Sequence, residues 1–477
     1  MERMFWIFVA LLAGILTGLG AQQNAFSTYF EDQTLRVDYY HVGTADQESI
    51  VLDELYRLDG WAGSRINLID TLNRGHYLLR VFDNRTQQLI FSRGFSTLFN
   101  EWQTTEEARQ GGQKVIHETV RLPFPRRPIL IEIVSRDRKN RFTEVIFSRV
   151  IDPDQETIRK EPRISDVLVE HLIENGEPSH HVDVVILGDG FTSDEWDRFR
   201  EQASWLVDTL FTISPFKEHR SRFNVSLVLK PSPESGTDDP RAGVFKRTPL
   251  NTTFNTFRLQ RYLMTYDNRA VQDVASAVPF DAIIILVNTR KYGGGGIYNL
   301  YASTAAFHPW TPYVFVHEFG HSFAGLGDEY YTSQVAYSEF YPKGTEPWEP
   351  NITALLNPPS VKWQRFVAPD TPIPTPWGKE KYDQFNREFG QKLSELRRQG
   401  APESKIKKLS REYRKKIKMF FEKNPYKEAV GAFEGAGYAS RGLYRPALDC
   451  IMFSRTLAGF DPVCAQAIEQ TIRFIAR

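Results

Sequence analysis

The segment VHEFGHSFAGLGDEYY, residues 316–331, constrains this chain more than any other. His317 and His321 are four residues apart, so on a helix their imidazoles project from the same face, one turn apart. Apolar residues precede the first histidine, which predicts a helix that runs through a core and carries both rings inward. Two imidazoles placed in this way can hold one metal ion, and the spacing is typical of catalytic zinc sites.

A catalytic zinc ion needs a third protein ligand and one open position. Asp328 and Glu329 follow Gly325 and Gly327, two glycines that can end the helix and turn the chain back. A carboxylate at this point would complete a site of two imidazoles and one carboxylate, with water in the fourth position. The residues leave three sources open for that ligand: Asp328, Glu329, or a later carboxylate near Glu339.

The residues around the histidines also suggest catalytic groups. Glu318 lies beside the first histidine, where it could take a proton from the attacking water as a general base. Tyr438 and Tyr444 are phenols that could donate a hydrogen bond to a developing oxyanion, and we name Tyr444 as the candidate. Met452 fits either a hydrophobic floor beneath a metal or an ordinary core. The competing interpretation of the motif itself is a core helix with one buried and one exposed histidine.

The stretch HEFGHSFAGLGDEYY resembles the signature of the bacterial IgA-peptidase family of secreted zinc metalloendopeptidases. A later block, GAFEGAGYASRGLYRPALDCIMFS, also resembles the family, and the resemblance covers roughly Val182 to the C-terminus. It implies a zincin-like α/β catalytic domain that hydrolyses peptide bonds, with immunoglobulin A or other host glycoproteins as substrates. It also implies Zn²⁺ held by His317, His321 and Asp328, with Glu318 as the catalytic base.

The first residues read MERMFWIFVALLAGILTGLGA, an apolar run that ends in small residues. This pattern predicts a signal peptide over residues 1–21, and hence a secreted, periplasmic or cell-surface protein without stable membrane insertion. The alternative is an uncleaved membrane anchor. The 59 basic and 59 acidic residues cancel, so no global field attracts the chain to nucleic acid.

The remaining chain divides by pattern into two predicted domains. Residues 22–160 hold short runs of branched and aromatic residues separated by turn formers, which predicts a β-sandwich. Residues 161–477 begin with alternating strand and helix patterns, which predict an α/β catalytic domain with a mainly parallel sheet. Within it, residues 378–424 predict an inserted helical hairpin with one apolar stripe on each helix. The fold class is therefore α+β and multidomain.

Two further features carry predictions about structure. Cys450 and Cys464 are the only cysteines, and in an exported chain they predict one disulfide, with two free thiols as the alternative. The glycine run at 293–296 precedes residues 297–307, which we expect to form an edge strand before the histidine helix. A peptide substrate could add to such a strand, and the glycines would let it approach closely.

Two classes of function fit these residues. The first is a zinc metalloendopeptidase whose partner is a protein or peptide substrate. The second is an exported protein that binds a surface protein or glycan and holds a structural zinc ion, which needs ligands but no base. Glu318 beside the first histidine favours the enzyme. The sequence does not determine the oligomeric state.

Overall fold

The computed structural model describes residues 26–160, 165–332 and 340–476. The predicted signal peptide and Glu339 lie outside these residues. Within the described ranges, no helix is both long and apolar enough to cross a membrane. The chain forms two compact units: the first holds Met1–Leu326, Gln334–Pro342 and Gln466–Arg477, and the second holds Gly327–Ser333 and Lys343–Ala465.

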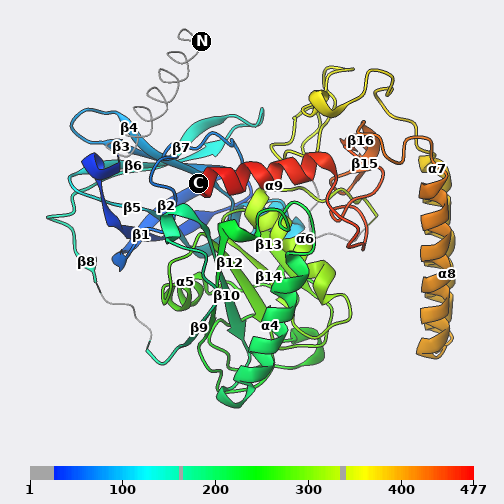
Figure 1. Ribbon diagram of the computed structural model, residues 1–477, viewed down its shortest axis with the longest axis horizontal. Helices are drawn as coiled ribbons and strands as arrows, with labels where there is room; N and C mark the ends of the chain where they lie inside the picture. The colour runs from blue at the N-terminus through cyan, green and yellow to red at the C-terminus, as the bar shows by residue number, and fades with distance from the viewer. Residues whose placement is uncertain (1–25, 161–164, 333–339, 477) are drawn as a thin grey trace, which may run out of the picture. The chain divides into compact units, whose positions relative to one another are not determined.

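The N-terminal part of the first unit contains two four-stranded sheets, ordered β5-β1-β2-β8 and β4-β3-β6-β7 (Figure 1). Strand β3 alternates buried and half-buried residues, as expected when one face of a sheet covers a core. Buried residues of both sheets share one apolar cluster, so the sheets pack face to face. Their strands are β1 (Phe30–Gly43), β2 (Glu48–Asp59), β3 (Tyr77–Asp83), β4 (Leu89–Phe95), β5 (Lys114–Pro125), β6 (Ile129–Arg136), β7 (Phe142–Ile151) and β8 (Ile158–Arg159).

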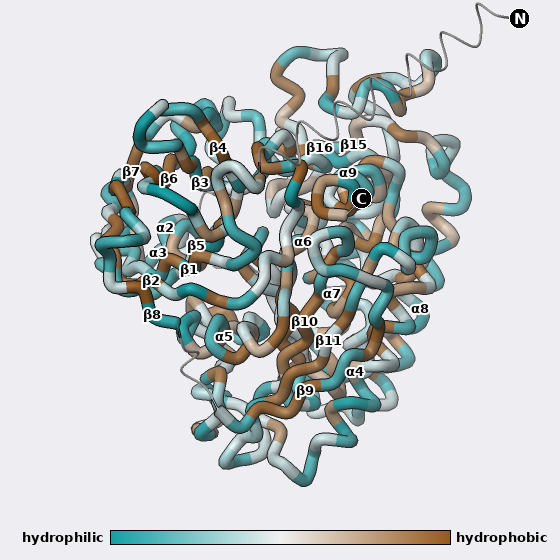
Figure 2. The backbone as a smooth tube through the Cα atoms, turned by 60° about the vertical axis from the view of Figure 1, so that its left-hand side comes forward, coloured by the Kyte–Doolittle hydropathy of each residue, from teal (hydrophilic) through white to brown (hydrophobic). Residues whose placement is uncertain are grey.

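The same unit contains a six-stranded sheet ordered β13-β14-β12-β10-β11-β9. Strand β10 pairs in parallel with β11 and β12, and β12 pairs in parallel with β14. Every residue of β10 is buried, which explains its apolar run at residues 184–187 and the brown colour of the strand in Figure 2. The strands are β9 (Leu168–Ile173), β10 (Val182–Asp189), β11 (Phe223–Leu229), β12 (Ala282–Val287), β13 (Gly294–Ile297) and β14 (Tyr301–Ala305).

Helices cover this sheet and join it to the N-terminal strands. Helix α6 contacts β12, β13 and β14, and α5 contacts β10, β11 and β5. At the α5 contact, buried Arg36 of β1 forms ion pairs with Asp38 at 2.6 Å and with Asp273 of α5 at 2.5 Å. This pairing satisfies charges that would be costly to bury alone. The helices that lie wholly within the described part of this unit are α2 (Leu98–Gln103), α3 (Glu106–Arg109), α4 (Trp196–Leu210), α5 (Asn268–Ala275) and α6 (Thr311–Ala324).

The second unit contains a helical hairpin and a two-stranded sheet. Helices α7 (Lys379–Arg398) and α8 (Glu403–Glu422) lie side by side in Figure 1, where the sequence predicts two helices. Strands β15 (Phe433–Ala436) and β16 (Ala439–Arg445) pair antiparallel. Helix α9 (Pro462–Ile475) begins in this unit and ends in the first. The whole chain is thus a mixed α/β protein with several sheets and a β-rich N-terminal region.

The predicted edge strand over residues 297–307 is wrong in its position. The structure has two strands there: β13 forms the edge of the sheet, and β14 lies inside it. The glycines belong to β13 itself because this strand packs directly against α6. A Cβ added at Gly296 would lie 2.3 Å from the carbonyl oxygen of Glu318, so only glycine fits.

Candidate metal centre

Helix α6 carries the histidine motif and has clear signals at both ends. A proline lies in its first turn, where the missing N–H costs no hydrogen bond. Gly325 follows the helix with a left-handed φ of 62°, and its N–H donates to the carbonyl of His321 at 2.9 Å. The N–H of Leu326 donates to the carbonyl of Gly320 at 3.3 Å. The first bond is the one that closes an αL-type helix end, so one of the two predicted glycines does terminate the helix.

His317 and His321, the histidine pair, point their Nε2 atoms toward each other at 3.2 Å. Two nitrogens bound to one tetrahedral zinc ion at about 2.0–2.1 Å would be separated by about 3.3–3.4 Å. The side chains therefore already stand at the spacing that a shared zinc ion requires. His317 is buried and His321 is half-buried.

The hydrogen bonds of the other ring nitrogens orient the pair. Nδ1 of His321 lies 2.5 Å from the carbonyl oxygen of Leu326 and must donate to it, because a carbonyl only accepts. This contact leaves Nε2 of His321 as the lone-pair nitrogen that can bind a metal. Nδ1 of His317 lies 3.2 Å from the hydroxyl of Tyr313, one turn earlier on α6. Both rings are held by a second interaction, as metal-binding histidines usually are.

The N-terminal strands brace the end of α6. Arg74, which lies just before β3, is buried and donates from Nη1 to the carbonyl oxygen of Ala324 at 3.1 Å. The same nitrogen donates to the carbonyl of Ala467 at 3.0 Å and to Thr471 Oγ1 at 2.8 Å, both on α9. Sequence reasoning missed this residue because its partners lie 250 to 397 positions away. No local pattern marks an arginine of this kind.

The two carboxylates that follow α6, Asp328 and Glu329, belong to the second unit and have different surroundings there. Asp328 accepts a hydrogen bond from the hydroxyl of Tyr438. Glu329 is fully buried, and its Oε1 accepts from Asn351 Nδ2 at 2.9 Å and from the thiol of Cys464 at 3.3 Å. Burial raises the pKa of Glu329 well above its usual range, and nearby Asp461 raises it further.

Asn351 fixes the backbone of this segment. Its Oδ1 accepts from the N–H of Gly327 at 2.7 Å, and its Nδ2 donates to the carbonyl of Gly327 at 2.9 Å. The carbonyl of Met452 accepts from the N–H of Glu329 at 2.9 Å, and the N–H of Gly437 donates to the carbonyl of Asp328 at 2.8 Å. The conformation of residues 327–329 is therefore set by distant parts of the chain.

The predicted disulfide is wrong: Cys450 and Cys464 are both buried free thiols. Each sulfur takes part in hydrogen bonds instead. Cys450 Sγ accepts from the N–H of Met452 at 3.5 Å and of Asp461 at 3.4 Å, while Cys464 donates to Glu329. Burial raises the pKa of both thiols. The number and spacing of cysteines in an exported chain do not reveal these neighbours.

The structure separates the two candidate tyrosines. Tyr438 contacts Asp328 through its hydroxyl, whereas Tyr444 lies in β16 and packs on the small apolar core of the second unit. The backbone of Tyr444 pairs with Thr353 through hydrogen bonds of 2.9 and 3.1 Å. Its role as an oxyanion donor stays a prediction. The side chain of Met452 is fully buried, and its backbone supports Glu329.

Comparison with known families matches both parts of the chain. The family described as IgA Peptidase M64 matches residues 170–472, and the domain described as Peptidase M64 N-terminus matches residues 25–147. No curated protein matches the chain. The first match includes the histidine pair, and the second covers strands β1 to β6 and the first part of β7.

Proposed function

This chain belongs to the IgA peptidase M64 family, and from that premise we propose that it is an exported zinc endopeptidase with a zincin-like active-site helix. The observation that carries the proposal is the approach of the two Nε2 atoms on α6 to 3.2 Å, which suits one tetrahedral zinc ion. Family membership makes the chain a peptidase, and the histidine pair supplies the reason to name zinc as its metal.

In this proposal His317, His321 and Asp328 hold the zinc ion. Asp328 is preferred to Glu329 because Glu329 is fully buried and already accepts from Asn351 and Cys464. Asp328 follows His321 by seven residues, just past the left-handed turn at Gly325. When bound, zinc supplies a Lewis acid that polarises the scissile carbonyl and lowers the pKa of a coordinated water.

Glu318 is the proposed general base. It follows His317 directly on α6, and its side chain is half-buried, so it keeps some access to solvent. Glu318 takes the proton from the attacking water and later passes it to the leaving amine. Tyr438 orients the carboxylate of Asp328 through its hydroxyl. The substrate class is peptide bonds of exported or host proteins, including immunoglobulin A.

The test combines zinc content with cleavage of a panel of folded and denatured proteins that includes immunoglobulin A. We expect Glu318→Gln to keep its zinc at the histidine pair and to lose activity by about 10²–10⁴-fold, the usual contribution of a general base. The matched control is Glu201→Gln, an exposed glutamate on α4, which should cleave like the wild type. Equal activity of the wild type and Glu318→Gln would overturn the assignment of the base.

The second candidate function is an exported binding protein whose zinc ion is structural. The N-terminal region pairs with α5 through Arg36 and bonds to the end of α6 through Arg74, which suggests that it supports the catalytic helix rather than forming a separate binding module. If the wild type holds zinc at the histidine pair and cleaves nothing in the panel, that result would favour the binding function over the peptidase. A wild type that holds no zinc at this pair would contradict both functions.

A further inference from the structure

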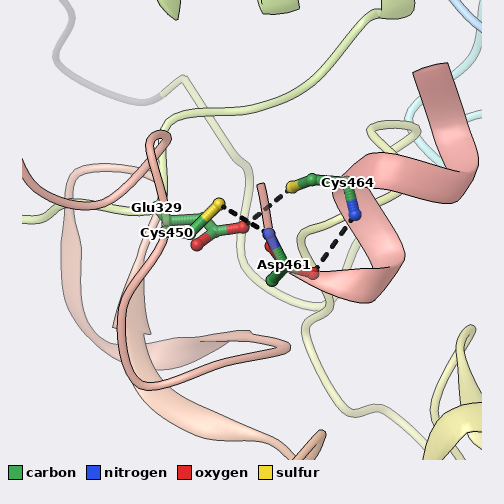
Figure 3. Close-up of side chains that lie close together, drawn as sticks. All are labelled: Glu329, Cys450, Asp461 and Cys464. Carbon is green, nitrogen blue, oxygen red and sulfur yellow. Dashed lines mark hydrogen bonds between the residues drawn. The ribbon is translucent and has the colours of Figure 1, made fainter. Parts of the chain in front are cut away.

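A second group of metal-binding side chains lies entirely within the second unit (Figure 3). Its members come from the segment after α6, the loop after β16, and the start of α9. All are almost fully buried, between 0% and 5% exposed, and their ligand atoms lie within 4.8 Å of one another. We call this group the cysteine–carboxylate cluster; it consists of Glu329, Cys450, Asp461 and Cys464.

Each carboxylate of the cluster has one oxygen that accepts hydrogen bonds and one that has no hydrogen-bond partner among the described residues. Oε1 of Glu329 accepts from Asn351 and Cys464, whereas its Oε2 is buried without a hydrogen-bond partner among the described residues. Oδ1 of Asp461 caps α9 by accepting from the N–H groups of Val463 at 2.8 Å and Cys464 at 3.2 Å. Its Oδ2 is likewise buried and has no partner in the described chain. Buried acceptors left in this way are costly unless a donor, a water or a cation satisfies them, and a cation would satisfy both at once.

The surroundings of both sulfur atoms would stabilise the thiolates that a bound metal ion requires, although burial alone raises the pKa of the thiols. Two backbone N–H groups, from Met452 and Asp461, donate to Cys450 Sγ, and such donors stabilise a negatively charged sulfur. Cys464 lies in the first turn of the 14-residue helix α9, where the helix dipole also favours negative charge. Figure 3 shows the hydrogen bond from Cys464 Sγ to the carboxylate of Glu329 and the one from the backbone nitrogen of Asp461 to Cys450 Sγ.

A buried cation helps to balance the charge of these four ligands. Arg445 is fully buried and acts electrostatically on Glu329. The guanidinium is held in place by the carbonyl oxygen of Gly435 at 2.7 Å and that of Leu448 at 3.3 Å. Two thiolates and two carboxylates carry a charge of about −4, which a divalent ion and one guanidinium would reduce to about −1.

We propose that the cysteine–carboxylate cluster binds one zinc ion as a closed structural site, in addition to the zinc ion at the histidine pair. Thiolates select zinc over calcium or magnesium, which prefer oxygen ligands only. Four protein ligands fill a tetrahedral site and leave no position for water, as in structural zinc sites. The ligand atoms now lie up to 4.8 Å apart, and they would move about 1 Å closer together to form zinc–sulfur bonds of about 2.3 Å.

Binding exchanges protons for the metal and involves no oxidant. The thiol protons of Cys450 and Cys464, and the proton that burial favours on Glu329, leave to solvent as the bonds to zinc form. The ion then joins three separate segments of the second unit. Because Glu329 is next to Asp328, the site also fixes the segment that carries the proposed third ligand of the catalytic zinc ion.

The test measures the metal content of the full chain together with the spectrum of its cobalt-substituted form. We expect two zinc ions per wild-type chain and, with cobalt, the thiolate-to-cobalt charge-transfer absorption in the near ultraviolet. The double variant Cys450→Ser with Cys464→Ser should lose one ion and this absorption. The matched variant His317→Ala with His321→Ala should also lose one ion but keep the absorption, so the two sites fail independently.

X-ray absorption at the zinc edge of the unaltered protein gives an answer even if a variant does not fold. Sulfur neighbours at about 2.3 Å support the proposal. Zinc with only nitrogen and oxygen neighbours overturns it, whatever the number of ions bound. A wild-type chain whose two cysteines are oxidised to a disulfide, or remain free while zinc is present in excess, overturns it as well. Glu329→Gln, which keeps size and thiols, should weaken binding of the sulfur-bound ion by at least 10-fold.

Discussion

The histidine pair and the cysteine–carboxylate cluster are both buried groups of metal-binding side chains, but they are constructed differently. The pair lies on one helix, whose period places both imidazoles on one face, and their Nε2 atoms lie 3.2 Å apart. The cluster collects side chains from positions 329 to 464, three segments that meet only in the folded second unit. The contrast teaches that a site on one helix keeps its geometry under local change, whereas a site from several segments depends on how they pack.

The largest expected effect comes from Asp328, the proposed ligand that stands beside a member of the cluster. Asp328→Asn should weaken zinc at the histidine pair by at least 100-fold and reduce cleavage in proportion, because it removes a negatively charged ligand. Sulfur-bound zinc should remain, which a competing chelator titration can show. The control is Asp370→Asn, an exposed carboxylate of the same unit. If Asp328→Asn binds zinc with wild-type affinity, Asp328 is not the third ligand at the histidine pair.

The dependence of unfolding free energy on pH tests His41, a buried residue of the first unit that belongs to neither group of metal-binding side chains. Burial lowers the pKa of His41, but the carboxylates of Glu118 at 2.9 Å and Glu48 at 3.0 Å raise it to about 9. A folded-state pKa above the unfolded value of about 6.5 stabilises the fold fully below pH 6.5. This contribution, roughly 3 kcal/mol, is lost as the pH rises through about 9.

The measurement is the free energy of unfolding between pH 6 and about pH 10, with His41→Gln as the comparison. The variant should be less stable at pH 6 and should show a smaller loss of stability toward high pH. If the free energy of unfolding falls equally with pH in both proteins, the pH dependence does not come from His41. The side chains of the histidine pair and of the cysteine–carboxylate cluster would then be the next groups to test.

The next effect tests how closely β13 supports the helix of the histidine pair. Gly296→Ala should destabilise the protein by about 2 kcal/mol, since its Cβ would meet the carbonyl oxygen of Glu318 at 2.3 Å. Gly390→Ala, on helix α7 with open space around the new Cβ, should stabilise it by up to about 1 kcal/mol. Thermal unfolding compares the two. A neutral Gly296→Ala would contradict the close packing that holds α6.

The smallest effect concerns the tyrosines. Tyr438→Phe removes the hydroxyl that donates to Asp328 and should weaken zinc at the histidine pair by about 10-fold. Tyr444→Phe should leave zinc affinity unchanged, because this side chain packs on an apolar core. Zinc titration and measurement of kcat/KM distinguish the effects of the two variants. A large fall in kcat with unchanged zinc in Tyr444→Phe would instead support the oxyanion role predicted from the sequence.

Local patterns predicted the elements of the fold better than their assembly. The helical period and Gly325 gave α6 and its end, and alternating apolar residues gave the N-terminal strands. The edge strand was misplaced because nothing local says that glycines at 294–296 lie against a helix. The disulfide was wrong because cysteine spacing does not reveal the hydrogen-bond partners of a buried sulfur.

The sequence by itself determined which residues could carry catalysis, since a four-residue spacing on a helix places His317 and His321 on one face in any fold. Only the tertiary structure decided how they are held: Arg74 caps α6 from 250 residues away, and Asn351 fixes the turn at Gly327. Only the tertiary structure placed Glu329 beside Cys450 and Cys464. The physical reason is that helix geometry acts over a few residues, whereas burial and hydrogen bonding act on whatever the folded chain brings within about 3 Å.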